Sequence, residues 1–154
     1  MAKTDFVVDK DNLEVRIVRV FNCTPERLWQ AHTTKDEIEQ WWENTEVDKL
    51  DVRVGGTWRF VSQGEMNGKP NAFRGEFKEL DEPRKIIRTF EYEPMPGHEM
   101  TESVIFEPVG DSQTKQTTVS KFANLQDLEG MVGMGMEHGA EAGLDRLAKV
   151  VESN

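Results

Sequence analysis

Cysteine is almost absent from this sequence, and long hydrophobic runs are missing altogether. The single cysteine, Cys23, excludes an internal disulfide and a zinc site built from cysteines. We interpret Cys23 as a small residue at the end of a strand, because no basic cluster beside it would activate the thiol. No apolar run approaches the roughly 20 residues that a membrane-spanning helix needs. The first residues also lack the charged and apolar segments of a signal peptide, so we expect a cytoplasmic protein.

Basic residues are also fewer than acidic ones. The chain carries 19 Lys and Arg residues against 29 Asp and Glu residues, a net charge of −10, and no basic stripe interrupts this balance. Nucleic acids and anionic membrane surfaces would repel such a protein, so we expect neither as a partner. We interpret the acidity as a source of solubility, with attraction of a basic protein partner as the alternative.

The motifs of common enzyme classes are also missing. The histidines, His32, His98 and His138, lie far apart, and none has a second metal ligand at the usual spacing. There is no nucleophile elbow, Walker loop or dinucleotide-binding fingerprint. Gly55 and Gly56 lie between two strand-like runs, which is typical of a hairpin turn rather than a phosphate-binding loop. We therefore expect no metal and no cofactor, and no motif assigns a catalytic residue.

The chain does contain enough apolar residues for one core. A length of 154 residues, of which 36% are hydrophobic, predicts a single globular domain spanning residues 1–154. Residues 1–12 are polar and are interpreted as a loose N-terminal arm. The alternation of apolar and charged side chains in residues 14–21 then predicts the first strand.

Two short helices are predicted directly after this strand. Thr24 followed by Pro25 is a typical helix start, and the sequence of residues 34–37 fits a capping box. Trp41 and Trp42 follow, and two neighbouring side chains on one short helix are not expected to face inward together. One ring is therefore expected in the core. The other is either a partly exposed cap or a residue at the entrance of a cavity, where indole supplies apolar area and one N–H donor.

From residue 46 to residue 122, apolar residues recur at every second position, which predicts β-strands. Turn signals at regular intervals divide this stretch into six strands connected by hairpins. Together with the strand at residues 14–21, they predict a strongly bent antiparallel sheet of about seven strands. The turns are Gly55–Gly56, Asn67–Gly68, Asp81–Pro83, Pro94–Gly97 and Gly110–Asp111.

The residues from Asn124 onward predict one long amphipathic helix, with apolar side chains at the spacing of a helix packed on a sheet. Gly139 and Gly143 lie on its apolar face. Either they allow the helix backbone to lie close on the sheet, or their missing side chains form the ceiling of a cavity. The apolar face consists of Val132, Met136, Ala140, Leu144, Leu147 and Val151.

The stretch from Gly130 to Gly135 disturbs this helix. Each glycine disfavours a helix interior by about 1 kcal/mol relative to alanine. On a continuous helix, Met131 and Met134 would also point away from the apolar face. We therefore expect the helix to break near Gly135 and this stretch to form a mobile gate at a cavity mouth, consisting of Met131, Met134 and Gly135. Methionine suits this role because its side chain is flexible and repacks around different shapes.

Two charged residues in the predicted strands share a face with apolar neighbours. Arg88 lies on the same side of its strand as Phe90 and Tyr92, and Glu102 lies on the same side as Val104. We expect these two inward charges to neutralise each other across neighbouring strands. The alternative is that Glu102 anchors a ligand or acts as a general acid or base.

Several ordered stretches, which cover nearly the whole chain, are similar to a known family. They are residues 25–29, the pair Trp41–Trp42, residues 51–56 with Trp58 and Phe60, residues 74–76, residues 87–90, residues 135–139 and residues 144–147. The chain resembles the activator of heat-shock-protein-90 ATPase-like family within the START-like (SRPBCC) superfamily. The resemblance implies an α+β helix-grip fold, in which the C-terminal helix packs across the curved sheet above a hydrophobic cavity. Members often carry a bulky aromatic residue where this chain has Ala140, which would enlarge the cavity or let the helix lie lower.

These observations lead to three hypotheses of function. The leading one is binding of a small hydrophobic or aromatic molecule between the sheet and the C-terminal helix. The resemblance implies the second, a chaperone-associated interaction module that stimulates a heat-shock ATPase through an exposed surface that includes Trp41. The third is a small lyase, hydrolase or cyclase that uses a buried carboxylate. The expected ligand-binding residues are Trp42, Trp58, Phe60, Phe73, Phe90, Tyr92, Glu102, Met136, Gly139 and Gly143.

Overall fold

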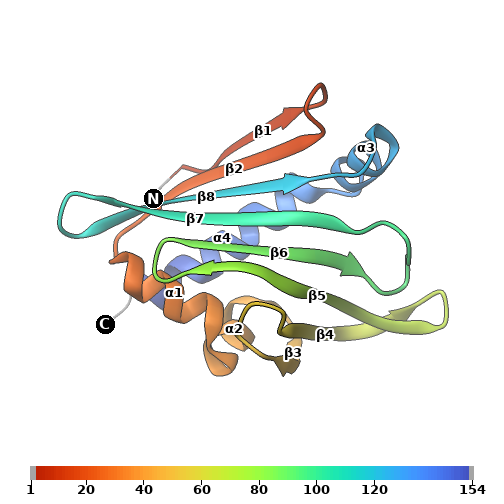
Figure 1. Cartoon of the computed structure of the whole chain (residues 1–154), viewed down its shortest axis with the longest axis horizontal. Helices are drawn as coiled ribbons and strands as arrows, with labels where there is room; N and C mark the ends of the chain where they lie inside the picture. Colours follow the sequence, from red (N-terminus) through yellow and green to blue (C-terminus); the bar gives the residue numbers. More distant parts are fainter. Residues whose placement is uncertain (1–2, 153–154) are drawn as a thin grey trace.

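The computed structural model describes residues 3–152, which form an eight-stranded antiparallel sheet and four helices (Figure 1). The strand order is β1-β2-β8-β7-β6-β5-β4-β3. Helix α4 crosses one face of the sheet, where α1 packs against α4 and β7, and α2 packs against α4 and β3. The predicted α+β helix-grip fold is therefore confirmed. The strands are β1 (Asp5–Asp9), β2 (Glu14–Phe21), β3 (Thr45–Leu50), β4 (Thr57–Met66), β5 (Lys69–Asp81), β6 (Lys85–Tyr92), β7 (Met100–Val109) and β8 (Gln113–Lys121); the helices are α1 (Pro25–Thr33), α2 (Lys35–Trp41), α3 (Leu125–Gly133) and α4 (Met136–Glu152).

The N-terminal segment corrects the prediction of a loose arm. Residues 5–9 form the edge strand β1, which pairs with β2 so that Phe6 lies opposite Ile17. Phe6 and Val8 are half-buried against the core, which explains why this short, largely polar segment joins the sheet. The sheet therefore has eight strands in the described residues rather than about seven.

The two short helices begin where the sequence predicted, but only one of them has the predicted cap. The Thr24 hydroxyl accepts a hydrogen bond from the Arg27 backbone N–H at 3.2 Å, as an N-cap does. The prediction of a capping box at residues 34–37 is wrong, because Thr34 makes no side-chain cap hydrogen bond. The Glu37 carboxylate instead binds Arg27 of α1 and accepts a hydrogen bond from Gln30 at 2.6 Å, so it joins the two helices.

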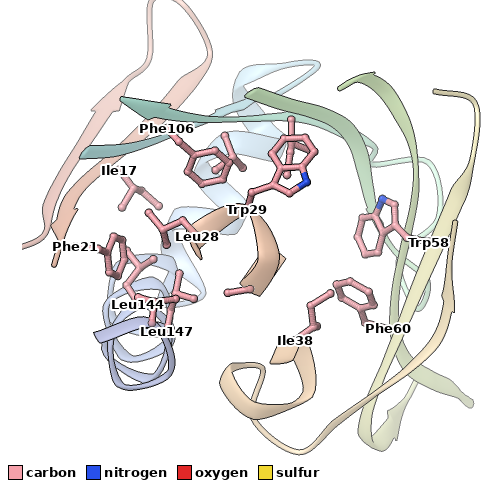
Figure 2. Packing of buried hydrophobic residues seen from close by; sticks show 14 of the residues in the cluster. Ile17, Phe21, Leu28, Trp29, Ile38, Trp58, Phe60, Phe106, Leu144 and Leu147 are labelled. Atoms are coloured by element: carbon pink, nitrogen blue, oxygen red, sulfur yellow. The ribbon is translucent and has the colours of Figure 1, made fainter. Parts of the chain in front are cut away.

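The core lies on the helix-covered face of the sheet (Figure 2). Leu28 of α1 points toward Phe21 of β2 and toward Leu144 and Leu147 of α4, and all of these side chains are buried. Trp58 and Phe60 of β4, near Ile38 of α2, form a second part of the core that is separate from the group around Leu28 (Figure 2). Burial of apolar side chains in both parts supplies the main driving force for packing the helices on the sheet.

Helix α4 is also fixed to β2 by charge. Arg19 is 3% exposed and donates to the Asp145 carboxylate of α4 at 2.6 Å. At the end of the same strand, the Asn22 backbone N–H donates to the Glu152 carboxylate at 2.8 Å. Because the Arg19 guanidinium is buried, loss of Asp145 would leave a charge without its partner, which is costly in a protein interior.

Strands β5 and β6 approach each other closely at Gly75. A β-carbon added to Gly75 would lie 1.9 Å from the carbonyl oxygen of Thr89 and 2.7 Å from Nε1 of Trp58. Only glycine fits at this position, because both neighbouring groups belong to the packed sheet and its core.

We expect Gly75→Ala to lower the free energy of unfolding by about 1–3 kcal/mol, because the added carbon forces the two strands apart. Gly130→Ala is the matched control. An added β-carbon there meets no atom within 4 Å, and α3 should gain up to about 1 kcal/mol from the better helix former. Urea unfolding followed by tryptophan fluorescence measures both. A Gly75→Ala protein as stable as the parent would contradict the close approach.

Candidate functional site

The C-terminal helical region is divided in two at Gly135. Helix α3 ends at Gly133, α4 starts at Met136, and Gly135 between them has a φ of +90°, which is a left-handed conformation. The predicted break near Gly135 is therefore confirmed. The predicted irregularity of the whole stretch from Gly130 is wrong, because α3 is regular through Gly133. Its N-cap, Asn124, accepts from the Asp127 backbone N–H at 2.8 Å, which stabilises the helix despite its glycines.

The two glycines of α4 border open space. A β-carbon added to Gly139 would meet no atom within 4 Å, and one added to Gly143 would meet only Nη2 of Arg146 at 3.9 Å. The alternative in which these glycines let the helix lie close on the sheet is therefore wrong. The N-terminal half of α4 passes over a space that its own side chains do not fill.

This space forms a cavity with two parts, between the sheet and the two C-terminal helices. The inner chamber, of about 440 Å³, lies under α4 and is bounded by Trp42, Glu102, Ser120 and Gly139, among other residues. The outer chamber, of about 580 Å³, lies under α3 and extends to Tyr92 and His98. The two chambers are adjacent, because they share the lining residues Phe73, Phe90, Met100, Met131 and Met136.

Trp41 and Trp42 both line the inner chamber, which corrects the expectation that only one faces inward. Helix α2 ends at Trp41, and Trp42 takes an extended conformation with φ −88° and ψ 110°. The change of backbone direction between them turns both rings to the same side. Trp41 donates its indole N–H to the Ala31 carbonyl at 3.0 Å and is half-buried, so it is not an exposed contact residue. Trp42 packs against Phe60, with ring centres 5.0 Å apart.

Methionine dominates the outer chamber. The walls include Met95 from the loop after β6, Met100 from β7, and Met131, Met134 and Met136 from the C-terminal helices. Met134 is 65% exposed, which places it at the edge of the chamber toward solvent. A wall of flexible thioether side chains adapts to ligands of different shape at little cost.

A hydrogen bond and an ion pair hold α3 over the outer chamber. His98, in the loop before β7, lies 2.7 Å from the Asp127 carboxylate, and Lys10, in the β1–β2 turn, lies 3.0 Å from the Glu129 carboxylate. His98 and Glu129 are at least half-exposed, so these contacts hold α3 weakly. The buried Leu128 supplies its main apolar contact with the core.

Polar side chains line the floor of the inner chamber. Arg88 of β6 donates through Nε to Oε1 of Glu102 on β7 at 2.8 Å, so the predicted pairing is confirmed. The Arg88 guanidinium also lies over the Trp58 ring at 4.4 Å, which stabilises its charge by a cation–π contact. His32 of α1 donates through Nε2 to Oε1 of Gln116 on β8 at 2.8 Å.

His32 stays uncharged in this environment. Burial disfavours the charged ring and lowers its pKa from 6.5 to about 4; the nearby positive charge of Arg88 lowers this pKa further, and the hydrogen bond to Gln116 opposes the change. The inner chamber therefore contains a neutral imidazole beside a neutralised Arg–Glu pair.

The lowered pKa of His32 predicts a pH dependence of stability. The unfolded chain binds a proton on this histidine below pH 6.5, whereas the folded chain does so only below about pH 4, so stability falls as the pH falls through this interval. We expect the parent protein to lose about 2 kcal/mol more unfolding free energy than His32→Gln between pH 7 and pH 5. Urea unfolding at both pH values measures this difference. Equal losses of unfolding free energy in the two proteins would show that folding does not lower the pKa of His32.

Most of the residues predicted from the sequence to bind a ligand line the cavity. The exceptions are Trp58 and Phe60, which are each 1% exposed and lie in the core behind Phe90 and Trp42. The predicted residues that the structure brings together around the chambers are Trp42, Phe73, Phe90, Tyr92, Glu102, Met131, Met134, Gly135, Met136, Gly139 and Gly143.

Sequence reasoning missed several polar lining residues. Gln116, Thr118 and Ser120 alternate along β8 toward the chamber, and His32 reaches it from α1. The sequence did contain a signal for the inward position of these β8 residues, because they alternate on the same face as the apolar Phe122, which is buried. Within residues 3–152, no three His, Cys, Asp or Glu side chains are grouped as a metal site requires.

Comparison with known families identifies the chain. A family model described as Activator of Hsp90 ATPase homolog 1-like protein matches residues 22–152. The chain belongs to this family. No curated protein matches the sequence. None of the helices in the described range 3–152 has the length and apolar character needed to cross a bilayer.

Solved structures show the same fold as this member of the Hsp90-activator-like family. A protein from Mycobacterium smegmatis is 23% identical, with a TM-score of 0.83 over 99% of this chain and 98% of that chain. A protein from Arthrobacter aurescens is 20% identical, with a TM-score of 0.85 over 96% and 91%. An Hsp90 activator from Plasmodium falciparum is 22% identical, with a TM-score of 0.60 over 71% and 72%. At these identities the likeness establishes the fold alone.

Proposed function

We propose that this protein binds a small, mainly apolar molecule in the two chambers between the sheet and the C-terminal helices. The observation that carries the proposal is the open space beside Gly139 and Gly143, where α4 does not lie close on the sheet. Each chamber has a volume in the range of small-molecule sites, about 300–1,000 Å³. Aromatic rings and methionines make up much of the lining, and a few polar groups are available to orient a ligand.

Entry to the cavity is proposed to occur under α3. The break at Gly135 separates this helix from α4, and its polar contacts with the rest of the protein, through Asp127 and Glu129, each involve at least one half-exposed side chain. Movement of α3 about Gly135 would carry Met131 and Met134 away from the outer chamber while α4 stays in place. This gives Met131, Met134 and Gly135 the gating role expected from the sequence.

A catalytic role for Glu102 finds less support than ligand binding. A general acid or base in this cavity needs a carboxylate that is buried, beside the cavity and free to exchange a proton. Glu102 lies beside the cavity and is 15% exposed, but it is held in an ion pair with Arg88 at 2.8 Å. The pair is better suited to orienting a ligand than to transferring protons.

Filling the space beneath α4 tests the binding proposal. We expect Gly139→Leu to weaken binding of N-phenyl-1-naphthylamine, an uncharged dye that fluoresces in apolar surroundings, by at least about 10-fold, since roughly 1.4 kcal/mol of lost contact gives that factor. Stability should not fall, because leucine is the better helix former. Fluorescence titration measures the affinity, and native mass spectrometry of the parent protein shows whether a small molecule co-purifies.

His138→Leu is the matched control for this substitution. His138 neighbours Gly139 but is exposed and lines neither chamber, so the added leucine leaves the cavity unchanged. Its affinity for the dye should equal that of the parent protein. The binding proposal fails if the parent shows no dye binding, no co-purifying molecule and no thermal stabilisation by a panel of lipids and aromatic compounds.

A second candidate function is interaction with a heat-shock chaperone. Membership of the family, and the structural likeness to an Hsp90 activator from Plasmodium falciparum, favour it. Such an interaction requires an exposed surface. Trp41 does not contribute to that surface as expected from the sequence, because its ring is turned into the inner chamber.

The isolated protein tests this second candidate in an Hsp90 ATPase assay. If the surface acts on the chaperone, ATP hydrolysis should rise at least about two-fold at high micromolar concentration of the protein, a level suited to weak, transient interfaces. Gly139→Leu places a side chain at an exposed position of α4 that also lines the inner chamber, so weaker stimulation by this variant would show that α4 takes part in the interface. Absence of stimulation by either protein would remove the chaperone function.

A further inference from the structure

The polar groups on the floor of the inner chamber lie in a single row across three strands. Arg88 of β6 is opposite Glu102 of β7, and Glu102 is opposite Ser120 of β8. All three side chains line the inner chamber. The next row toward the outer chamber is apolar, with Phe90 opposite Met100. The cavity therefore changes from apolar to polar over one step along the strands.

This row has hydrogen-bonding capacity that the protein does not use. Arg88 donates only through Nε, so its two Nη groups make no hydrogen bond within the described part of the chain. The arginine side chain is only 8% exposed, yet neither Nη is among the fully enclosed atoms that lack a partner, so both reach the cavity. Oε2 of Glu102 and the hydroxyl of Ser120 likewise have no partner among residues 3–152. Unused donors and acceptors in a buried site favour a ligand that satisfies them.

The charges in this row cancel. Arg88 contributes one positive charge and Glu102 one negative charge, and they lie in direct contact. An anionic head group that approached the Arg88 Nη donors would also lie beside the Glu102 carboxylate and would be repelled by it. A cationic head group that approached Glu102 would likewise lie beside the Arg88 guanidinium and would be repelled by it. An uncharged group that accepts from Arg88 and donates to Glu102 meets neither repulsion.

We propose that the ligand is an uncharged amphiphile, with a polar head that both donates and accepts hydrogen bonds and an apolar body. The head, such as a primary carboxamide or a hydroxyl beside a carbonyl, binds Arg88, Glu102 and Ser120. The body extends past Phe90 and Met100 into the outer chamber. This inference rests on the proposed binding function and names the ligand class for the same site.

Probes with one body and different heads test the proposal. Naphthalene, 2-naphthamide and 2-naphthoate share a bicyclic ring that carries no group, a neutral carboxamide or an anionic carboxylate. We expect 2-naphthamide to bind at least 10-fold more tightly than either of the others at pH 7, as measured by competition with N-phenyl-1-naphthylamine. This comparison uses the unaltered protein, so it does not depend on the folding of any variant.

Removing the negative charge should change the preference. In Glu102→Gln the repulsion is gone, so 2-naphthoate should gain at least 10-fold in affinity while naphthalene changes by less than two-fold. Glu91→Gln is the matched control. Glu91 pairs with Arg74 on the opposite face of the sheet, and its side chain is 14% exposed against 15% for Glu102. Affinities for all three probes should be unchanged in that variant.

The outcomes separate the head-group inference from the binding function. If the dye and naphthalene bind but 2-naphthoate binds as tightly as 2-naphthamide, the cavity binds apolar molecules and the head-group inference is wrong. A Glu102→Gln protein that folds, as judged by its melting curve, and shows no gain for 2-naphthoate overturns the role of the pair. If neither the dye nor any probe binds, the binding function itself fails.

Discussion

The closer attachment of α4 at its C-terminal end is the constraint on which the rest of this structure depends. Its C-terminal half is held by buried Leu147 and Val151, by the ion pair of Asp145 with Arg19, and by the contact of Glu152 with β2. Its N-terminal half packs less closely, since Met136 and Ala140 are only half-buried against the core and Gly139 and Gly143 border open space. A helix is rigid over this length, so firm packing at one end keeps the other raised above the floor. The cavity follows from that asymmetry.

The aromatic side chains behind the cavity support its polar floor. Trp58 is almost fully buried, and its ring lies beneath the Arg88 guanidinium at 4.4 Å. A buried arginine held by a ring on one side and by Glu102 on the other has little freedom to move. The core residue Trp58, which was first expected to line the site, therefore acts on it indirectly by fixing the orientation of Arg88.

More of the fold than of the candidate site could be predicted from the sequence. Alternation along the strands placed Arg88 and Glu102 on the inner face, but it did not fix the register that sets them opposite each other, because residues 93–99 form a long connection between β6 and β7. The orientation of Trp42 depends instead on where α2 ends, and the sequence places helix ends poorly. Gln116 and Ser120 are polar residues whose inward position was indicated only by their shared face with Phe122, and both are buried beneath the helices, where His32 of α1 binds Gln116.

The break at Gly135 has a consequence for how fast a ligand would exchange. Helix α4 and the sheet set the volume and polarity of the inner chamber. Under the proposed binding function, they would set the equilibrium preference among ligands, whereas α3, held by the polar contacts of Asp127 and Glu129, would set the barrier to entry and departure. Residence time and selectivity would then depend on two separate helices.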